Sequence, residues 1–404
     1  YCSPMSGLNI GMVAGEPSGD LLASRIQRGL QQQDPNAVFN GIGGPEMTSA
    51  RFNAWYPMDA LSVFGYVDAL KSLPRLLNTY YGARRRWLKQ RPDVFVGIDA
   101  PDFNLRMEAD LRKSGIATVQ FVSPSIWAWR YERIHTIRKA VSHMLVLFPF
   151  EVDIYQKEGI PVTYVGHPLA QNIPLVPDQK AARLRLNIPE DVKILGVLPG
   201  SRKSEIMQLA PRFLQTVQRL QKDDPALHVV VPVVNEARHQ QFLEILRDNP
   251  VENLRIITND TQAPVFLEDG GKKPVAWDVM EASDALLVAS GTATLEAALY
   301  KKPMVISYVL TPMMKKLMAW QSGQEKPLLD WIGLPNILSQ DCVVPELLHD
   351  DAEPEKLAKA CEQALHDTSW RQGVEQRFQQ LHEVLRLDTP KLAAEVIMQV
   401  ARER

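Results

Sequence analysis

The chain has few cysteines and no long apolar run, and both absences narrow what it can be. Its three cysteines are spaced neither as metal ligands nor as a disulfide framework, which predicts a reducing, cytoplasmic location. No stretch is apolar over the length of a transmembrane helix, and no signal peptide precedes the first strand-like segment near residue 8. The net charge of −2 gives no overall field that would recruit nucleic acid.

Three patterns that often mark metal or cofactor sites are also missing. No D-x-D sequence occurs, although metal-dependent sugar transferases often use such carboxylates to hold a divalent ion. None of the eight histidines has metal-site spacing. The loop VAGEPSGD (13–20) lacks the G-x-G-x-x-G pattern of dinucleotide-binding domains. We therefore predict no metal and no bound cofactor.

What the chain does have is a long alternation of strand-like and helix-like segments. Its 404 residues, 45% of them hydrophobic and 23% charged, suit a globular protein of two domains. Continuous apolar runs are typical of parallel strands covered on both faces. The predicted fold class is α/β, with two doubly wound Rossmann-like domains facing a cleft and C-terminal helices. Strands are predicted at 9–14, 38–42, 94–98, 118–122, 144–148 and 163–165, and near 193–198, 228–234, 254–258, 284–289 and 304–309.

The domain boundaries follow from a break in this alternation. The proline-containing segment 167–179 has no periodicity and is expected to act as a linker. We therefore place one domain at 1–168 and a second at 169–375. The helical, charged residues 376–404 form C-terminal helices that could pack back on the N-terminal domain.

Two segments of the second domain share a pattern that is typical of phosphate binding. Each predicts a buried strand, a tight turn of small residues and a helix start: LGVLPGSRKSEI (195–206) and ASDALLVASGTATLEAALYKKPMVIS (282–307). Helix N-termini present unpaired N–H groups and a positive dipole end, so each can bind an anion. The candidate phosphate-binding residues are Gly200, Ser201, Arg202, Ser290, Gly291, Thr292 and Ala293.

Such turns also occur in any parallel α/β protein, where they merely cap the helix. For one turn alone the capping interpretation is favoured. Two turns in one domain, with Arg202 just after the first, favour a bound diphosphate. Glu296 lies one turn into the second helix, where a carboxylate could hold ribose hydroxyls. The combination indicates a nucleotide-sugar site.

Five motifs together resemble the lipid-A-disaccharide synthase family. They are VAGEPSGD (13–20), VGIDAPDFN (96–104), FVSPSIWAWR (121–130), LPGSRKSE (198–205) and ASGTATLE (289–296), and LPNIL (334–338) adds to the match. The resemblance runs from about residue 8 to the C-terminus and is most specific at SPSIWAWR. The polar, lysine-rich stretch 311–330 departs from it.

The resemblance implies a GT-B-type inverting glycosyltransferase. Such an enzyme joins UDP-2,3-diacylglucosamine to 2,3-diacylglucosamine 1-phosphate, releasing UDP and forming the β-1,6-linked disaccharide of lipid A. It makes 1–168 the acceptor- and membrane-facing domain and 169–375 the UDP-sugar-binding domain. It also implies Asn336, within LPNIL, as a nucleotide contact.

Three residues are candidates for the chemistry. Asp99 ends a predicted strand and suits a general base that takes the acceptor hydroxyl proton. Arg202, with the amides of Gly200, Gly291 and Thr292, suits stabilisation of the departing diphosphate. Glu16 follows the first strand and could bind an acceptor hydroxyl or assist Asp99. Helix capping is the alternative for Asp99 and Asp102, and we assign it mostly to Asp102.

The acceptor side is expected to include Ser18, Trp127, Trp129 and Arg130. Ser18 could instead cap the helix that follows VAGEPSGD. Two nearby tryptophans are usually core residues. These two follow a predicted strand end and have Arg130 beside them, so contact with the acceptor sugar or its phosphate is an equal alternative.

The segment 61–90 is expected to meet lipid. Apolar residues recur there at helical spacing. The alternative to lipid contact is a structural role, in which two amphipathic helices pack on the sheet. The surplus of apolar side chains with a basic cluster also suits a helix lying in an anionic bilayer surface. The candidate lipid contacts are Val63, Phe64, Val67 and Leu70.

Other functions stay open from the sequence. One is another GT-B enzyme, such as a UDP-N-acetylglucosamine epimerase, which needs no lipid surface at 61–90. Another is a non-catalytic nucleotide-sugar or lipid-binding protein, which needs the phosphate-binding turns but not Asp99. The expected partners are the two lipid-sugar substrates and the cytoplasmic face of the inner membrane, with no nucleic acid. The chain could also form a homodimer.

Overall fold

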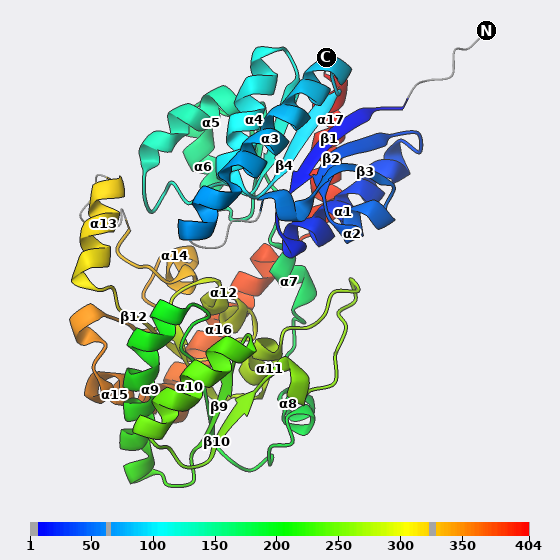
Figure 1. The fold of residues 1–404 in the computed structure, drawn as a ribbon. Helices are drawn as coiled ribbons and strands as arrows, with labels where there is room; N and C mark the ends of the chain where they lie inside the picture. The colour runs from blue at the N-terminus through cyan, green and yellow to red at the C-terminus, as the bar shows by residue number, and fades with distance from the viewer. Residues whose placement is uncertain (1–6, 62–65, 323–328, 404) are drawn as a thin grey trace. The chain divides into compact units, whose positions relative to one another are not determined.

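The computed structural model describes residues 7–61, 66–322 and 329–403. The chain divides into two compact units, one of residues 1–168 and 386–404 and the other of residues 169–385. We call them unit 1 and unit 2. Each is a parallel sheet with helices on both faces (Figure 1), so each is a Rossmann-like domain.

Unit 1 contains a seven-stranded sheet in the order β3-β2-β1-β4-β5-β6-β7. The elements up to the linker are β1 Asn9–Ala14, α1 Pro17–Gln33, β2 Val38–Gly43, α2 Pro45–Ser49, β3 Phe52–Pro57, α3 Tyr66–Gln90, β4 Val94–Ile98, α4 Pro101–Lys113, β5 Ala117–Phe121, α5 Ile134–Ala140, β6 His143–Val146, α6 Phe150–Lys157, β7 Val162–Tyr164 and α7 Pro168–Asn172.

Unit 2 contains a six-stranded sheet in the order β10-β9-β8-β11-β12-β13. Its elements are α8 Gln179–Arg185, β8 Ile194–Leu198, α9 Lys203–Asp223, β9 His228–Pro232, α10 Glu236–Asp248, β10 Leu254–Ile257, α11 Val275–Ala282, β11 Ala285–Ala289, α12 Thr292–Leu299, β12 Met304–Tyr308, α13 Pro312–Ser322, α14 Leu334–Ser339, β13 Glu346–Leu348, α15 Pro354–His366 and α16 Thr368–Leu385.

The C-terminal residues are shared between the two units. Helix α16 runs unbroken to Leu385 within unit 2, whereas α17 (Thr389–Arg402) belongs to unit 1 and packs on α1 (Figure 1). Residues 376–404 are therefore not one helical segment. The described carboxylate Asp388 caps α17 by accepting from the Lys391 N–H at 3.4 Å.

Alternating side chains of β1 build the two cores of unit 1. Ile10 and Met12 pack with the buried faces of α1 and α17 on one side of the sheet. Val13 packs on the other side with Trp87 of α3 and Leu111 of α4. Both cores are continuous with the central strands, so the strand ends that carry functional side chains rest on rigid supports.

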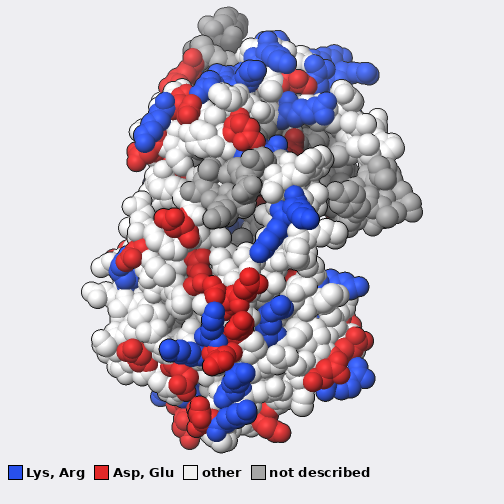
Figure 2. Space-filling model, turned by 90° about the vertical axis from the view of Figure 1, so that its left-hand side faces the viewer, with Lys and Arg blue, Asp and Glu red and all other residues white. Residues whose placement is uncertain are grey.

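Unit 2 is organised in the same way. One core joins β8, β9, β11 and β12 to α9, α10 and α15, and the other joins α8 and α11 to the opposite face. Figure 2 shows both signs of charge scattered over the face in view, which agrees with the net charge of −2. Among the described helices, none is both long and apolar enough to cross a membrane.

Candidate active site

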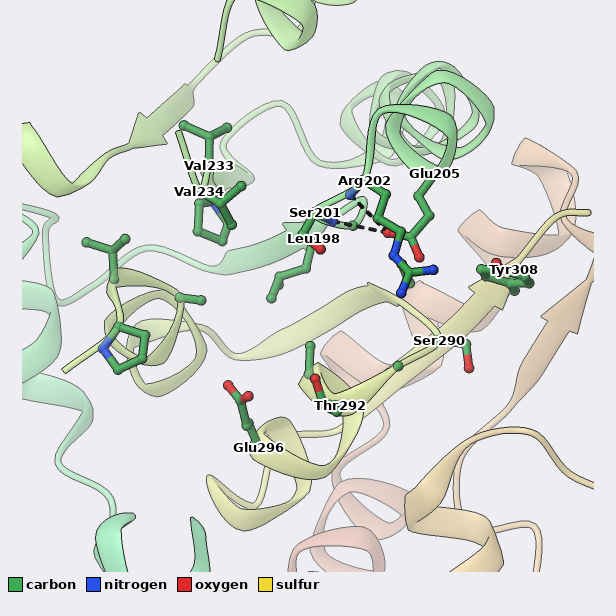
Figure 3. Close-up of a pocket in the computed structure, with 18 of the residues that line it drawn as sticks. Leu198, Ser201, Arg202, Glu205, Val233, Val234, Ser290, Thr292, Glu296 and Tyr308 are labelled. Carbon is green, nitrogen blue, oxygen red and sulfur yellow. Dashed lines mark hydrogen bonds between the residues drawn. The ribbon is translucent and has the colours of Figure 1, made fainter. Parts of the chain in front are cut away.

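Each sheet has one position where the strand order reverses, and ligands of such folds bind there, beyond the carboxyl ends of the strands. In unit 2 this position lies between β8 and β11. A pocket of about 680 Å³ opens at their carboxyl ends (Figure 3). Its lining includes Gly200, Ser201, Arg202, Glu205, Ser290, Gly291, Thr292, Ala293, Glu296 and Tyr308.

The turn after β11 is accessible to an anion. Helix α12 begins at Thr292, and no side chain caps its first turn. A Cβ placed on Gly291 would meet nothing within 4 Å, so the space above this turn is unobstructed. Ser290, Gly291, Thr292 and Ala293 all line the pocket. The N–H groups and positive dipole end of α12 can therefore reach an anion in it.

The turn after β8 differs from the sequence prediction. Glu205 Oε2 accepts the backbone N–H groups of Ser201 and Arg202, each at 3.2 Å. A Cβ on Gly200, whose φ is +112°, would lie 2.6 Å from the same oxygen. The amides of these two predicted nucleotide-binding residues are therefore satisfied by the carboxylate of α9 itself, which reaches back to the start of its own helix.

The Arg202 side chain remains suited to an anion. It is exposed, and Figure 3 shows its guanidinium and the Glu296 carboxylate pointing into the same space from α9 and α12. Arg202 thus offers a cation with several donors in a fixed fork, the geometry that matches phosphate oxygens.

Glu296 lies inside the pocket and is held there. Trp277, buried on α11, donates its Nε1–H to Glu296 Oε2 at 2.5 Å. Burial raises the pKa of Glu296 to about 7, and the hydrogen bond from Trp277 opposes part of that rise. The sequence analysis identified Glu296 but missed Trp277, because nineteen positions separate the two residues and only the fold brings them together.

Asn336 is not part of this pocket, contrary to the prediction. It is fully buried, and its Oδ1 accepts the N–H groups of Val343 at 2.8 Å and Val344 at 3.1 Å. Its Nδ2 donates to the Val344 carbonyl and to Glu346, each at 2.8 Å. The amide is therefore used entirely to hold the loop before β13, which gives Asn336 a structural role.

In unit 1 the strand order reverses between β1 and β4, and the predicted carboxylates follow these two strands. Glu16 lies two residues after β1, and Asp99 directly follows β4. The Asp99 side chain is open to solvent, yet the surrounding protein removes part of its hydration. This partial burial raises the pKa of Asp99, and the negative charge of Glu16 raises it further, whereas the Ala100 N–H lowers it.

The backbone at Asp99 is strained. Asp99 and Ala100 have φ values of +53° and +39°, which residues other than glycine rarely adopt. Such residues persist only where the surrounding structure holds them, and they cluster at functional sites. Among the described non-glycine residues with positive φ, only Asp99 and Ala100 are consecutive, so the end of β4 is an unusually strained turn.

The capping roles predicted for Ser18 and Asp102 are wrong. Ser18 is exposed inside α1, and Asp102 forms an exposed ion pair with Arg133 at 2.9 Å. Neither α1 nor α4 has a side-chain cap. Both begin with a proline, Pro17 and Pro101, whose fixed φ starts a helix without an N–H that needs a partner.

The tryptophans of SPSIWAWR differ in burial. Trp127 is a core residue: it packs edge-on against Phe150 and donates to Glu151 at 3.2 Å. Trp129 is half-buried and Arg130 is exposed, with an ion pair to Glu132 at 3.4 Å. Acceptor contact therefore stays a prediction for Trp129 and Arg130, and the core interpretation holds for Trp127.

In the predicted lipid segment, Tyr66–Gln90 form one helix, α3, where the helix-packing alternative had two helices. Val63 and Phe64 lie outside the described residues, as do the side chains of Val67 and Leu70. Further along, the described side chains at positions 73, 77 and 81 of α3 share one face, with 45%, 38% and 50% of their surface exposed. They are Leu73, Leu77 and Tyr81.

The described part of the stretch 311–330 exposes apolar as well as lysine side chains. Helix α13 exposes large apolar side chains that recur at helical spacing. They are Met313, Leu317 and Trp320. Among the described residues, no group of three or more His, Cys, Asp or Glu could hold a metal ion.

Comparison with protein families and curated proteins gives one consistent result. The family model for lipid-A-disaccharide synthetase matches residues 10–397. The lipid-A-disaccharide synthase of Bordetella avium is 62% identical over 394 residues, covering 98% of each chain. That of Aromatoleum aromaticum is 48% identical over 389 residues, covering 96% of this chain and 95% of the relative.

Comparison with solved structures concerns the fold. A UDP-GlcNAc 2-epimerase from Neisseria meningitidis, solved with UDP-GlcNAc, aligns with a TM-score of 0.62 at 11% identity, covering 98% of this chain and 100% of that chain. A glycosyltransferase from Rickettsia africae aligns with a TM-score of 0.56 at 11% identity, covering 98% and 100%. At such identity the likeness shows the fold alone, which is of the GT-B class.

Proposed function

This chain belongs to the lipid-A-disaccharide synthase family, and we propose that it joins UDP-2,3-diacylglucosamine to 2,3-diacylglucosamine 1-phosphate. Membership makes it a glycosyltransferase of lipid A biosynthesis that acts on a nucleotide sugar and a lipid-bearing sugar. The observation that carries the proposal is the family match over residues 10–397, which includes both strand ends with candidate site residues.

The unit 2 pocket is the proposed site of the UDP moiety. The diphosphate would bind to the uncapped N-terminus of α12 and to the Arg202 guanidinium. The ribose hydroxyls would donate to Glu296, whose carboxylate lines the same pocket. Arg202 would stabilise the charge that develops on UDP as it leaves, while Glu205 keeps the turn before α9 in shape.

Asp99 is the proposed general base. The acceptor hydroxyl oxygen attacks the anomeric carbon, its proton passes to the Asp99 carboxylate, and the bond from that carbon to the diphosphate oxygen breaks. Because partial burial and Glu16 raise the pKa of Asp99, the carboxylate is a better base than an ordinary aspartate. Attack opposite the leaving UDP inverts the anomeric configuration.

The alternatives from the sequence are not favoured. The epimerases that match are structural neighbours at 11–15% identity, a level that carries the fold and not the activity. The relatives that are 44–62% identical are all named lipid-A-disaccharide synthase. A non-catalytic binding protein would need the phosphate-binding turns but not Asp99, whose raised pKa suits a base.

Peripheral attachment to the cytoplasmic face of the inner membrane is the proposed location. It is supported by the α3 stripe, which we define as the exposed side chains Leu73, Leu77 and Tyr81. The exposed Arg75 and Arg85 of the same helix would add attraction to anionic lipid. The predicted homodimer stays a prediction.

One assay tests the proposed function. The purified protein is incubated with UDP-2,3-diacylglucosamine, with and without 2,3-diacylglucosamine 1-phosphate. We expect disaccharide and UDP only when both substrates are present. Release of UDP or of an epimerised sugar without the acceptor would favour the epimerase alternative, and binding without turnover would favour the non-catalytic one.

A further inference from the structure

A cluster of buried polar side chains lies beneath the strained end of β4. Asn104 and Glu108 come from α4, and Gln120 comes from β5, where it pairs with Gly97 of β4. All three side chains are completely buried. Buried polar groups of this kind are costly unless they are hydrogen-bonded, so their arrangement needs an explanation.

Two of these side chains hold the backbone of Asp99. Asn104 Nδ2 donates to the Asp99 carbonyl at 2.8 Å, and Gln120 Nε2 donates to the same oxygen at 3.0 Å. The Asp99 N–H donates to the Phe121 carbonyl at 2.9 Å. Both backbone polar groups of Asp99 are therefore fixed, which explains how it persists at a φ of +53°.

The orientation of the Gln120 amide is determined by its surroundings. Besides the Asp99 carbonyl, Nε2 faces the carbonyls of Phe121 and Val122, each at 3.2 Å. Turning the amide over would place Oε1 against three acceptors, which is repulsive. Gln120 Oε1 must therefore point the other way, toward the interior of the cluster.

Glu108 Oε1 borders the same interior space. Both Gln120 Oε1 and Glu108 Oε1 lie 2.5 Å from the point where a Cβ on Gly97 would sit, so both oxygens face the space over this glycine. Neither oxygen, nor Glu108 Oε2, has a hydrogen-bond partner among the described residues. An ionised Glu108 would place a negative charge near another buried, unpaired acceptor, whereas a protonated Glu108 carboxyl supplies the missing donor.

We propose that Glu108 is a neutral carboxylic acid whose O–H donates to Gln120 Oε1, so that Glu108 and Gln120 are positioning residues for the proposed base Asp99. The inference rests on the proposed function through the role of Asp99. Burial raises the pKa of Glu108 well above its ordinary value, and it is the one cause of that shift, which agrees with a neutral acid at neutral pH. Glu108 therefore acts on the reaction through Gln120 and never touches the substrate.

The test compares Glu108→Leu with Glu108→Gln. Leucine removes the donor, so kcat should fall on the order of ten- to a hundredfold, the scale of loss for a misplaced catalytic group. Glutamine can donate from its amide and should restore most of that activity. KM for the UDP-sugar should stay the same in both variants, because the proposed nucleotide contacts lie in unit 2.

Folding is controlled separately. Thr118→Val is a matched control, since it removes a buried hydrogen bond from the same strand, the one that the Thr118 hydroxyl donates to the Ala140 carbonyl at 2.6 Å. Its unfolding midpoint should fall while kcat stays the same. If Glu108→Leu does not fold, Glu108→Met with Gln120→Met replaces both partners by apolar groups of similar length. That double variant should fold and still lose kcat.

The Asp99→Asn background separates the two proposals. If the network acts through Asp99, Glu108→Leu should lower the rate of Asp99→Asn no further. Normal kcat in Glu108→Leu, or equal loss in Glu108→Gln, would overturn the positioning role while leaving an inactive Asp99→Asn intact as evidence for the base. Near-normal turnover of Asp99→Asn would overturn the base itself, and the positioning role with it.

Discussion

The indole Nε1 of Trp277 donates a hydrogen bond of 2.5 Å to Glu296 Oε2, so a buried side chain of α11 fixes a carboxylate that α12 directs into the unit 2 pocket. Trp277 is 3% exposed and edge-on to Tyr300, which leaves its ring little freedom. A carboxylate held in this way is ready for a ligand before the ligand arrives, which lowers the entropic cost of binding.

This arrangement predicts a pH dependence of UDP binding. Because burial raises the pKa of Glu296 to about 7, the carboxylate is protonated below that pH and ionised above it. Ribose hydroxyls donate better to the ionised form, so affinity should rise with pH through about 7 and then level off. Calorimetric titration with UDP at a series of pH values measures this rise.

UDP has a terminal phosphate that titrates in a similar pH range. Comparing the wild type with Glu296→Gln therefore separates the titration of Glu296 from that of UDP. That variant should lose the Glu296 part of the pH dependence. Trp277→Phe removes the donor that lowers the Glu296 pKa, so its midpoint should move to higher pH. Identical profiles in all three proteins would return Glu296 and Trp277 to a structural role.

Replacing Asp99 tests the proposed base. Asp99→Asn keeps the shape of the side chain and removes its basicity, and loss of a general base typically lowers the rate on the order of 10²–10⁴-fold. Turnover is measured as disaccharide formed at saturating substrates. Circular dichroism and the unfolding midpoint should match the wild type, since the Asp99 side chain is exposed. Near-normal turnover in a folded variant would remove Asp99 from the mechanism.

Replacing Arg202 tests the diphosphate contact. A hydrogen bond to a charged group contributes about 1.5–3 kcal/mol, so Arg202→Ala should weaken UDP binding roughly ten- to a hundredfold and slow turnover. The UDP affinity of Arg202→Lys should lie between those of the wild type and Arg202→Ala, because lysine keeps the charge and loses the planar fork. Lys203→Ala is the matched control: Lys203 is the exposed neighbour and does not line the pocket. Equal affinities in all four proteins would exclude the contact.

Because the chain contains no D-x-D pattern, we predict that turnover does not need a divalent cation. Activity should survive excess EDTA, because Arg202 and the dipole of α12 supply the positive field at the diphosphate. The rate is compared before chelation, after it, and after Mg²⁺ is added back. A collapse that Mg²⁺ reverses would show that this account of the diphosphate is wrong.

Much of the fold was predictable because it depends on local pattern. The continuous apolar runs of β1 and β4 gave the predicted strands Asn9–Ala14 and Val94–Ile98 without change. Strand β3 was missed because most of its residues, in FNAWYP, are exposed or half-buried and show no apolar run. Strand β13 was missed because its three residues begin with a charged glutamate and are only half-buried, so they form no apolar run.

The candidate site was predictable only where a charged residue lies shortly after the end of a predicted strand. Asp99 and Glu296 meet that condition, and Trp277 does not, because its role depends on how α11 packs beside α12. The capping of Ser201 and Arg202 by Glu205 was missed since Glu205 lies inside the motif that resembles a phosphate loop. The Glu108–Gln120 pair was missed because its two residues meet only when β5 pairs with β4.

The α3 stripe predicts reversible membrane attachment. A large apolar side chain gains roughly 1.5–3 kcal/mol at full burial, and the three members of the stripe are about half exposed, so together they should contribute about 2–4 kcal/mol. Replacing Leu73, Leu77 and Tyr81 by Ser should therefore lower binding to anionic vesicles on the order of a hundredfold. UDP affinity should not change, because the proposed nucleotide contacts lie in unit 2.

Co-flotation with liposomes measures the effect. Val176→Ser with Leu184→Ser is the matched control, since these apolar residues are 80% and 82% exposed in unit 2 and lie on neither α3 nor α13. Added salt should weaken the arginine contribution and leave the apolar part. If the triple variant unfolds, its side chains belong to the core. If it stays folded and still floats, the membrane contact lies elsewhere, and the exposed face of α13 is the next surface to replace.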